Sequence, residues 1–335
     1  MENSSTKFSV IIPVYNRPQE IRELLESLAS QEYRSFETII VEDGSTEKCA
    51  DICREFSDIV PNKYYYKENG GPAQARNFGA EKAKGEWLIF FDSDCILPPH
   101  YFNAAIKELE YEECQLFGGA DRSHPSFTTL QKAIDYSMTS IITTGGIRGN
   151  KKSADKFYPR TFNMGIKRSV FKETGGFSNM RFGEDVDFSY KVKEGGYDSR
   201  YFPDAWVYHK RRNTLRSFFK QVFNSGIARI HLTRRHPGTL KPVHLLPTAF
   251  FLGCIFLTIM AVLISGWFFM PMAFLSLILF MDSSVRKKSP VTGAVSIITS
   301  YIQLWGYGSG LLAGWWNVCI LKNETYAAFV KNFYR

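Results

Sequence analysis

Three short apolar runs, each ending abruptly at polar residues, constrain the fold of this chain most strongly: Phe8–Val14, Thr38–Val41 and Trp87–Phe91. Unbroken runs of this length, rich in β-branched and aromatic residues, indicate buried parallel strands. Between the first two, apolar residues recur at the spacing of one helix face, from Ile21 to Leu28. Strands that alternate with helices predict a doubly wound, mostly parallel α/β sheet.

Acidic residues follow two of these runs, at the sheet edge where ligands bind in folds of this class. Asp43 follows the second run, and Asp92 and Asp94 follow the third with Ser93 between them. Two carboxylates so close together repel each other and lose hydration, so a bound metal is the simplest explanation for them. The alternative is an aspartate-rich turn in which Asp92 caps the next helix.

A second acidic group, Glu184, Asp185 and Asp187, opens a helical pattern that ends at Gly195. Acids at a helix start complement the helix dipole, but three in four residues exceed what capping needs. Residues 121–160 are polar and glycine-rich and give no clear pattern. Neither a G-x-G-x-x-G nor a P-loop motif occurs, so a different mode of nucleotide binding is expected.

The net charge of +8 is concentrated in one segment of the chain. Residues 1–205 contain 26 Lys and Arg against 31 Asp and Glu, whereas residues 206–241 contain nine basic and no acidic residues. The basic side chains of 206–241 are interleaved with Phe, Val and Ile, as in an amphipathic segment on a surface of anionic lipids. RNA binding is the competing interpretation, and the apolar segments that follow argue against it. No nucleic-acid partner is expected.

Long uncharged segments follow the basic one. Residues 245–281 carry no charge and are interrupted only at Ser265-Gly266, which is enough for two membrane crossings of about 20 residues each. A further uncharged stretch, 291–320, reads as one long tilted span or a re-entrant pair. Its length favours three spans, whereas the basic tail favours an even number. Residues 242–335 are therefore expected to form two to four transmembrane segments.

Six segments occur in an order that resembles family 2 glycosyltransferases. The resemblance covers about residues 7–210 and implies a GT-A fold over 1–205, a nucleotide-diphosphate-sugar donor, Mg²⁺ or Mn²⁺ as cofactor, and inversion at the anomeric carbon. The segments are Val10–Asn16 (VIIPVYN), Val41–Ser45 (VEDGS), Gly71–Asn77 (GPAQARN), Asp92–Asp94 (DSD), Gly175–Phe177 (GGF) and Gly183–Phe188 (GEDVDF).

The same resemblance implies roles for individual residues, with Asp94 as the principal metal ligand, Asp92 and His209 beside it, and Asp185 as catalytic base. Glu184 would orient Asp185 or the acceptor, and Asp187 would be structural. His209 could equally be an interfacial residue beside its basic neighbours. The residues implied to bind the donor are Pro13, Tyr15, Asp43, Arg76, Asp92 and Ser93.

The expected function is transfer of a single sugar, because the chain departs from the family pattern in one respect. The Q-x-x-R-W motif of processive synthases is absent, since Gln221 is followed by no Arg-Trp pair. The expected acceptor is a hydroxyl of a lipid-linked saccharide, and the donor a UDP-sugar. The alternatives are a polyprenyl-phosphate sugar synthase and an inactive, nucleotide-sugar-binding membrane scaffold. The expected location is the inner membrane, with several spans and the catalytic domain in the cytoplasm.

Overall fold

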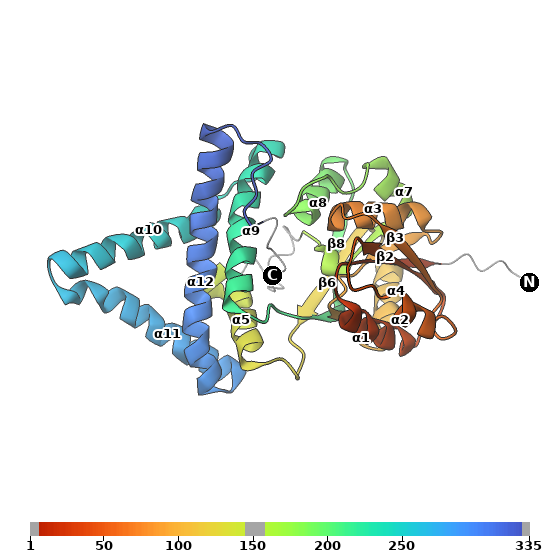
Figure 1. The fold of residues 1–335 in the computed structure, drawn as a ribbon, viewed down its shortest axis with the longest axis horizontal. Coiled ribbons are helices and arrows are strands. Elements are labelled where there is room, and N and C mark those ends of the chain that lie inside the picture. Colours follow the sequence, from red (N-terminus) through yellow and green to blue (C-terminus); the bar gives the residue numbers. More distant parts are fainter. Residues whose placement is uncertain (1–6, 145–157, 330–335) are drawn as a thin grey trace, which may run out of the picture. The chain divides into compact units, whose positions relative to one another are not determined.

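The computed structural model describes residues 7–144 and 158–329. The chain divides into two compact units. The first comprises Met1–His124 and Lys152–His209, and the second comprises Pro125–Lys151 and Lys210–Arg335. Figure 1 labels their helices and strands.

The first unit contains an eight-stranded mixed sheet with the order β3-β2-β1-β4-β7-β6-β8-β5. Strand β1 runs parallel to β2 and β4, β2 runs parallel to β3, and β6 runs parallel to β8. Antiparallel pairs are β4 with β7, β6 with β7, and β5 with β8. The expected doubly wound α/β fold is confirmed. The strands are β1 Phe8–Val14, β2 Phe36–Asp43, β3 Asn62–Lys67, β4 Trp87–Phe90, β5 Cys95–Ile96, β6 Leu116–Arg122, β7 Met164–Lys167 and β8 Ser199–His209.

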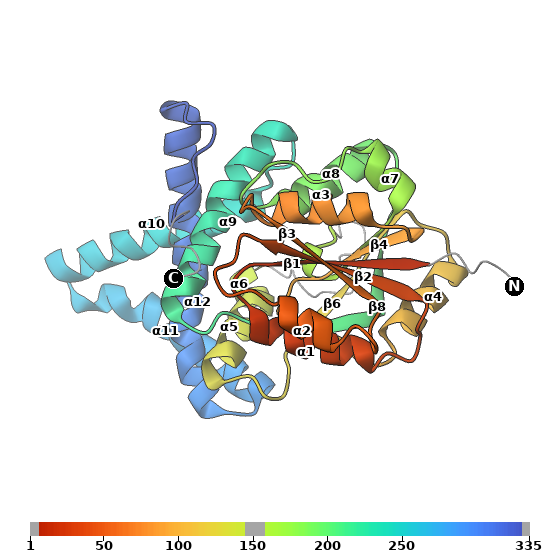
Figure 2. The ribbon, with the colours of Figure 1, turned by 45° about the vertical axis from the view of Figure 1, so that its right-hand side comes forward.

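Helices cover both faces of this sheet (Figure 2). One face carries α1 (Pro18–Ala29), α2 (Ala50–Glu55) and α4 (Tyr101–Tyr111). The other carries α3 (Pro72–Lys82), α7 (Arg168–Glu173) and α8 (Glu184–Glu194). Successive side chains of a strand point to opposite faces, so Val10 and Ile12 join the first core and Ile11 the second. This burial on both sides explains why the strand has no polar alternation.

Helix α12 is the centre of the second unit and packs against α5, α9, α10 and α11. Its approach to α9 is close because glycines face each other across the contact. A Cβ at Gly226 of α9 would overlap the carbonyl oxygen of Tyr307, and one at Gly310 would overlap that of Phe223. The elements are α5 Thr129–Thr139, α6 Ile141–Thr144, α9 Leu215–Arg235, α10 Pro242–Leu263, the 3₁₀ turn η3 Gly266–Phe269, α11 Met270–Lys287, α12 Pro290–Gly314 and the π-helical turn η4 Trp315–Ile320.

A buried ionic cluster joins three parts of this unit. The side chain of Asp135 in α5 accepts hydrogen bonds from Arg211, at 2.8 Å, and from Lys287 at the end of α11, at 2.6 Å. Asp135 and Arg211 are only 6% and 7% exposed. Removing either partner of such a pair would leave a buried charge uncompensated. The cluster therefore fixes the end of α11 against α5.

Two helical segments of the second unit, Pro242–Leu263 and Gly266–Lys287, are each 22 residues long and apolar enough to cross a membrane by length and composition. Only 17% and 11% of their most apolar windows are buried within the protein, unlike the core helices of a water-soluble bundle. Among the described residues, no third helix reaches the same criterion. The expected third segment forms α12, whose Ser296 and Thr299 are fully buried among other helices. The two candidate spans lie within the expected range of two to four membrane segments, and the number that crosses a membrane stays a prediction.

The domain boundary and the basic segment of residues 206–241 differ from what the sequence pattern predicts. The expected boundary at residue 205 falls inside β8, which continues because Val207 and Tyr208 pair with Asp121 and Arg122 of β6. The basic segment then forms α9, in which Lys220 is 2% exposed. A side chain buried to that extent does not face lipid. That the other basic residues lie on a membrane surface stays a prediction.

The glycine contact between α9 and α12 can be tested by Gly310→Ala. The added Cβ overlaps backbone that cannot move independently, so we expect a loss of about 1–3 kcal/mol, as for other overpacked contacts. Gly253→Ala in α10 is the matched control, because nothing lies within 4 Å of its added Cβ and alanine favours a helix. Thermal unfolding of the purified chain in detergent measures both. Equal stability of the two variants would contradict this packing.

Candidate active site

The carboxyl ends of β1, β2 and β4 lie along one edge of the sheet, because the three strands run parallel. Pro13 and Tyr15 come from the end of β1 and the loop after it, and Asp43 ends β2. Asp92 and Asp94 follow β4, with Ser93 between them only 7% exposed. The expected gathering of these residues on one rim is therefore present.

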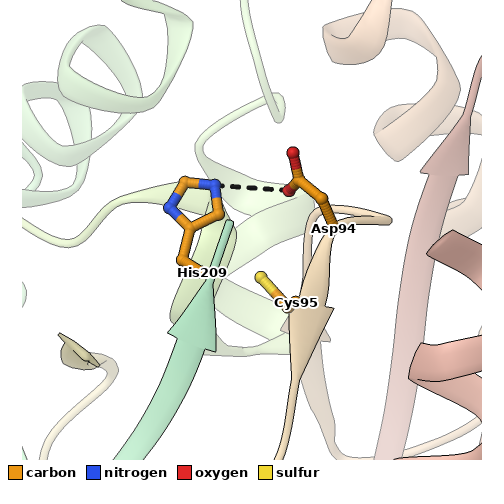
Figure 3. Close-up of side chains that lie close together, drawn as sticks. All are labelled: Asp94, Cys95 and His209. Atoms are coloured by element: carbon orange, nitrogen blue, oxygen red, sulfur yellow. Dashed lines mark ion pairs between the residues drawn. The ribbon is translucent and has the colours of Figure 1, made fainter. Parts of the chain in front are cut away.

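Strand β8 adds a histidine to this rim. Its last residue, His209, pairs with Cys95 of β5, directly after Asp94. Figure 3 shows the imidazole turned toward the Asp94 carboxylate, with Nε2 3.3 Å from Oδ1. The ring of Phe162 stacks on His209 with centroids 4.7 Å apart, which holds the imidazole in this orientation. The structure thus places His209 beside the two aspartates rather than on an interfacial surface.

These side chains form a donor set that fits a divalent cation. Ligand atoms of Asp94, Cys95 and His209 lie within 4.8 Å of one another. Burial, followed by the charges of Asp94 and Asp92, raises the pKa of the Cys95 thiol well above its usual value, so the sulfur stays protonated. Carboxylate oxygen suits Mg²⁺ or Mn²⁺, and an imidazole nitrogen can complete the coordination of a transition metal such as Mn²⁺, whereas a protonated thiol does not suit either ion. Asp94 and His209 are the residues that could hold such an ion.

Two arginines already compensate the charges of the aspartate pair. Nη1 of Arg17 lies 2.6 Å from Oδ2 of Asp94, and Nη2 of Arg76 lies 2.5 Å from Oδ1 of Asp92. From the sequence alone, a metal is the simplest explanation for these two neighbouring carboxylates. The structure shows that the chain supplies its own cations, so the proximity of the two acids does not by itself require a metal.

Arg76 also connects the two acidic groups of the site. Its Nη1 lies 2.9 Å from Oε1 of Glu184, at the start of α8, while Nη2 contacts Asp92. Arg76 is only 3% exposed, and its pair with Glu184 is buried, whereas the side chain of Asp92 is 31% exposed, so water reaches that pair in part. Arg76 is among the residues that the family resemblance implies to bind the donor, and the structure places it between two carboxylates. A contact with the donor stays a prediction.

The acids at the start of α8 have different surroundings. Glu184 is 8% exposed, and burial, followed by the charge of Asp185, raises its pKa to about 7. Asp185 accepts a hydrogen bond from the Val186 amide at 2.8 Å and lies 3.2 Å from Nη1 of Arg160. Asp187 is fully buried and accepts a hydrogen bond from Ser178, as expected of a structural residue. Of these three acids, only Glu184 forms an ion pair with Arg76, whereas Asp185 pairs with Arg160.

Asp43 organises the loop that follows β3. It accepts hydrogen bonds from the amides of Gly70 and Gly71, at 2.9 and 2.8 Å, and from Lys67 at 2.7 Å. Gly71 has a φ of +91°, and a Cβ there would lie 3.0 Å from the guanidinium of Arg181. The positive φ favours glycine at this position, whereas the flexible end of the Arg181 side chain could move away from an added Cβ. The predicted contact of Asp43 with the donor is untested by this geometry.

Sequence reasoning missed several residues that the fold brings to the site. Arg17 lies directly after the rim residues of β1, and this position was the available signal for it. Arg160 lies in the region without a pattern, and Phe162 lies just beyond it, so neither gave a signal. Nothing in the sequence distinguishes Lys67 at the end of its strand, and only the structure shows its ion pair with Asp43.

Comparison with known proteins identifies the fold of this site. Residues 9–175 match the family model described as glycosyl transferase family 2. A mannosyltransferase from Pyrobaculum calidifontis, solved in complex with GDP-Man and Mn²⁺, has a similar fold with a TM-score of 0.64. The two chains are 18% identical, and the alignment covers 90% of this chain and 88% of the other. This likeness concerns the fold and agrees with the expected fold class.

Relatives by sequence carry related names. Glycosyltransferase AglE of Haloferax volcanii is 28% identical over 230 residues, which cover 67% of this chain and 73% of AglE. A glycosyltransferase of Rickettsia conorii is 39% identical over 204 residues, 58% of this chain and 32% of its own length. Another from Rickettsia bellii is 34% identical over 144 residues, 43% of this chain and 20% of its own. The chain thus spans at most a third of the two Rickettsia proteins. Through the domain that matches at residues 9–175, the chain belongs to glycosyl transferase family 2.

Proposed function

We propose that the protein is a membrane-anchored, inverting glycosyltransferase that moves one sugar from a nucleotide-diphosphate sugar to a hydroxyl of a lipid-linked saccharide. The observation that carries the proposal is the link through Arg76 between the Asp92–Asp94 rim and the Glu184–Asp185 pair. This link places a site suited to a diphosphate leaving group beside a separate carboxylate suited to an acceptor. Both are needed to transfer a sugar in a single displacement.

On the donor side, Asp94 and His209 would hold Mg²⁺ or Mn²⁺. Such an ion, when bound, neutralises the charge that develops on a diphosphate leaving group. Pro13, Tyr15, Asp43 and Ser93 line the same rim and are the proposed contacts of the nucleoside. A UDP-sugar is the proposed donor, and the complex of the Pyrobaculum mannosyltransferase with GDP-Man and Mn²⁺ supports a nucleotide sugar and a divalent ion as a class.

On the acceptor side, Asp185 is the proposed general base. A sugar hydroxyl is a weak nucleophile, and a positioned carboxylate contributes by taking its proton as the oxygen bonds to the anomeric carbon. The bond from that carbon to the diphosphate oxygen breaks in the same displacement, which inverts the configuration. Glu184, held by Arg76, fixes the start of α8 and so orients Asp185.

A second acceptor class has one observation in its favour. Arg160 lies beside Asp185 and is a third exposed, so it could bind an anionic acceptor such as a polyprenyl phosphate. A phosphate is already ionised and would need no base. An inactive nucleotide-sugar-binding scaffold is the alternative of another class, and it would retain the donor rim without turnover.

The membrane anchor is proposed from the second unit. If α10 and α11 both cross, Lys241 before the first and Arg286–Lys288 at the end of the second lie on the same side. The positive-inside rule makes that side cytoplasmic, in keeping with the use of cytoplasmic nucleotide sugars. Two crossings also put the basic tail in the cytoplasm, which three crossings would not. Anionic lipids are the proposed partners of the exposed basic residues of 206–241.

The proposed function is tested by incubating the purified chain with a panel of nucleotide sugars and a membrane lipid extract. Mass spectrometry of the lipid fraction should show a glycolipid heavier by one sugar residue with one of the donors. A product that gains several sugars would contradict single transfer. Absence of turnover with every donor, although a nucleotide sugar binds, would support the scaffold instead.

Asp94→Asn tests the donor side. Loss of partners that merely orient a metal ligand costs about 10–100-fold in affinity, so loss of a direct ligand should weaken Mn²⁺-dependent nucleotide binding by at least about 100-fold. Asp58→Asn is the matched control, because this aspartate is exposed and outside the site. Calorimetric titration with and without Mn²⁺ measures the effect. Equal metal dependence in the two variants would remove Asp94 from the metal site.

Asp185→Asn tests the acceptor side. The variant should bind the donor as the parent does, while transfer falls by about 100-fold to 10,000-fold, as when a general base is lost. Asp204→Asn, at an exposed position of β8, is the control. Single-turnover assays separate donor binding from transfer. Transfer that survives in the Asn variant would favour a phosphate acceptor, as the position of Arg160 allows.

A further inference from the structure

The guanidinium of Arg17 occupies one oxygen of the carboxylate proposed to bind the metal. Its Nη1 lies 2.6 Å from Oδ2 of Asp94, while Oδ1 of the same carboxylate faces His209. The side chains of Arg17 and Asp94 are 23% and 15% exposed, so water screens this pair only in part. A cation bound at Asp94 would therefore lie close to the Arg17 guanidinium and be repelled by its charge.

The backbone before Arg17 is held firmly. Asn16 has a φ of +52°, and its side-chain oxygen accepts hydrogen bonds from the amides of Thr46 and Glu47 at 2.8 and 3.0 Å. Its own amide donates to Ser45 at 2.7 Å, and Ser45 in turn donates to the fully buried Glu42. The loops after β1 and β2 are therefore locked together. This lock directs Arg17, the cap residue of α1, toward Asp94.

Each aspartate of the rim faces an arginine of the chain. Asp92 faces Arg76, and Asp94 faces Arg17. A divalent ion at Asp94 would add two positive charges beside a guanidinium, and the repulsion would oppose its binding. A diphosphate supplies the negative charge that removes this obstacle, and it also gives the guanidinium a bidentate partner.

We infer that Arg17 makes the binding of divalent cation and nucleoside diphosphate interdependent: it neutralises Asp94 in the empty site and contacts a phosphate once both ligands are bound. The inference rests on the proposed function, because it assumes a diphosphate donor. By linkage, the factor by which the diphosphate strengthens Mn²⁺ binding equals the factor by which Mn²⁺ strengthens diphosphate binding. The two factors give an internal check.

The test measures Mn²⁺ affinity of the full purified chain in detergent, by titration followed with electron paramagnetic resonance, with and without saturating UDP or GDP. In the parent protein, the nucleotide should strengthen Mn²⁺ binding at least about tenfold, a coupling within the usual range. In Arg17→Gln, Mn²⁺ alone should bind about 3-fold to 10-fold more tightly, since the repelling charge is gone. The enhancement by the nucleotide should fall to less than about threefold in this variant.

Two further variants serve as references. Arg22→Gln removes another arginine of α1, whose ion pair with Glu55 lies 2.7 Å apart on the outer face, and should leave both Mn²⁺ affinities unchanged. Arg17→Lys keeps the charge and should retain weak binding of Mn²⁺ alone. This variant also keeps the inference testable if Arg17→Gln unfolds. If Arg17→Lys lost the enhancement by the nucleotide without binding Mn²⁺ more tightly, the result would contradict the proposed exchange of Asp94 for a phosphate.

The outcomes separate the inference from the proposed function. If the parent protein binds neither UDP nor GDP in the presence of Mn²⁺, the proposed function itself fails. If the parent binds them and Arg17→Gln, folded as judged by thermal unfolding, keeps the same Mn²⁺ affinity and the same enhancement, only the role of Arg17 is overturned. Tighter Mn²⁺ binding together with a reduced enhancement supports the inference.

Discussion

The ion pairs of Arg76 are the interaction on which the site depends. Arg76 is 3% exposed, so water solvates its guanidinium little. The ion pairs with Asp92 and Glu184 therefore compensate its charge. Helix α3 carries Arg76, and α8 begins at Glu184. This one side chain therefore fixes the distance between the Asp92–Asp94 rim and Asp185, the proposed base. Its planar, forked geometry suits two carboxylates approached from different elements, which a lysine would not match.

Charge balance explains the rest of the rim. Lys67 accompanies Asp43, Arg17 accompanies Asp94, and Arg160 accompanies Asp185. Each acid proposed to act on a ligand thus has a basic neighbour within the chain. The consequence is that ligands must exchange these contacts rather than fill an unbalanced site, so affinity is expected to depend on metal and diphosphate together.

The sequence predicted the parallel half of the sheet and the rim because those signals are local. The runs at Val10, Ile40 and Ile89 are apolar and bounded by turns, and parallel pairing then brings their ends together. The antiparallel strand β7 and the helix α5 lacked such signals, since their formation depends on pairing and packing with distant segments. The family resemblance implies that His209 lies beside Asp94, but the local pattern does not, because the contact depends on the pairing of β8 with β5. The packing of α12 depended likewise on tertiary contacts, which bury its Ser296 and Thr299.

A double-mutant cycle of unfolding free energy over Asp92→Asn and Glu184→Gln tests the bridging role of Arg76 most directly. Each single variant leaves the buried guanidinium one of its two ion pairs, whereas the double variant leaves it neither. The account predicts that the double variant loses at least about 1 kcal/mol more than the two single losses together, as for residues that share one ion-pair network. Losses that add to within about 0.5 kcal/mol would show that the two acids are independent and would contradict the bridge.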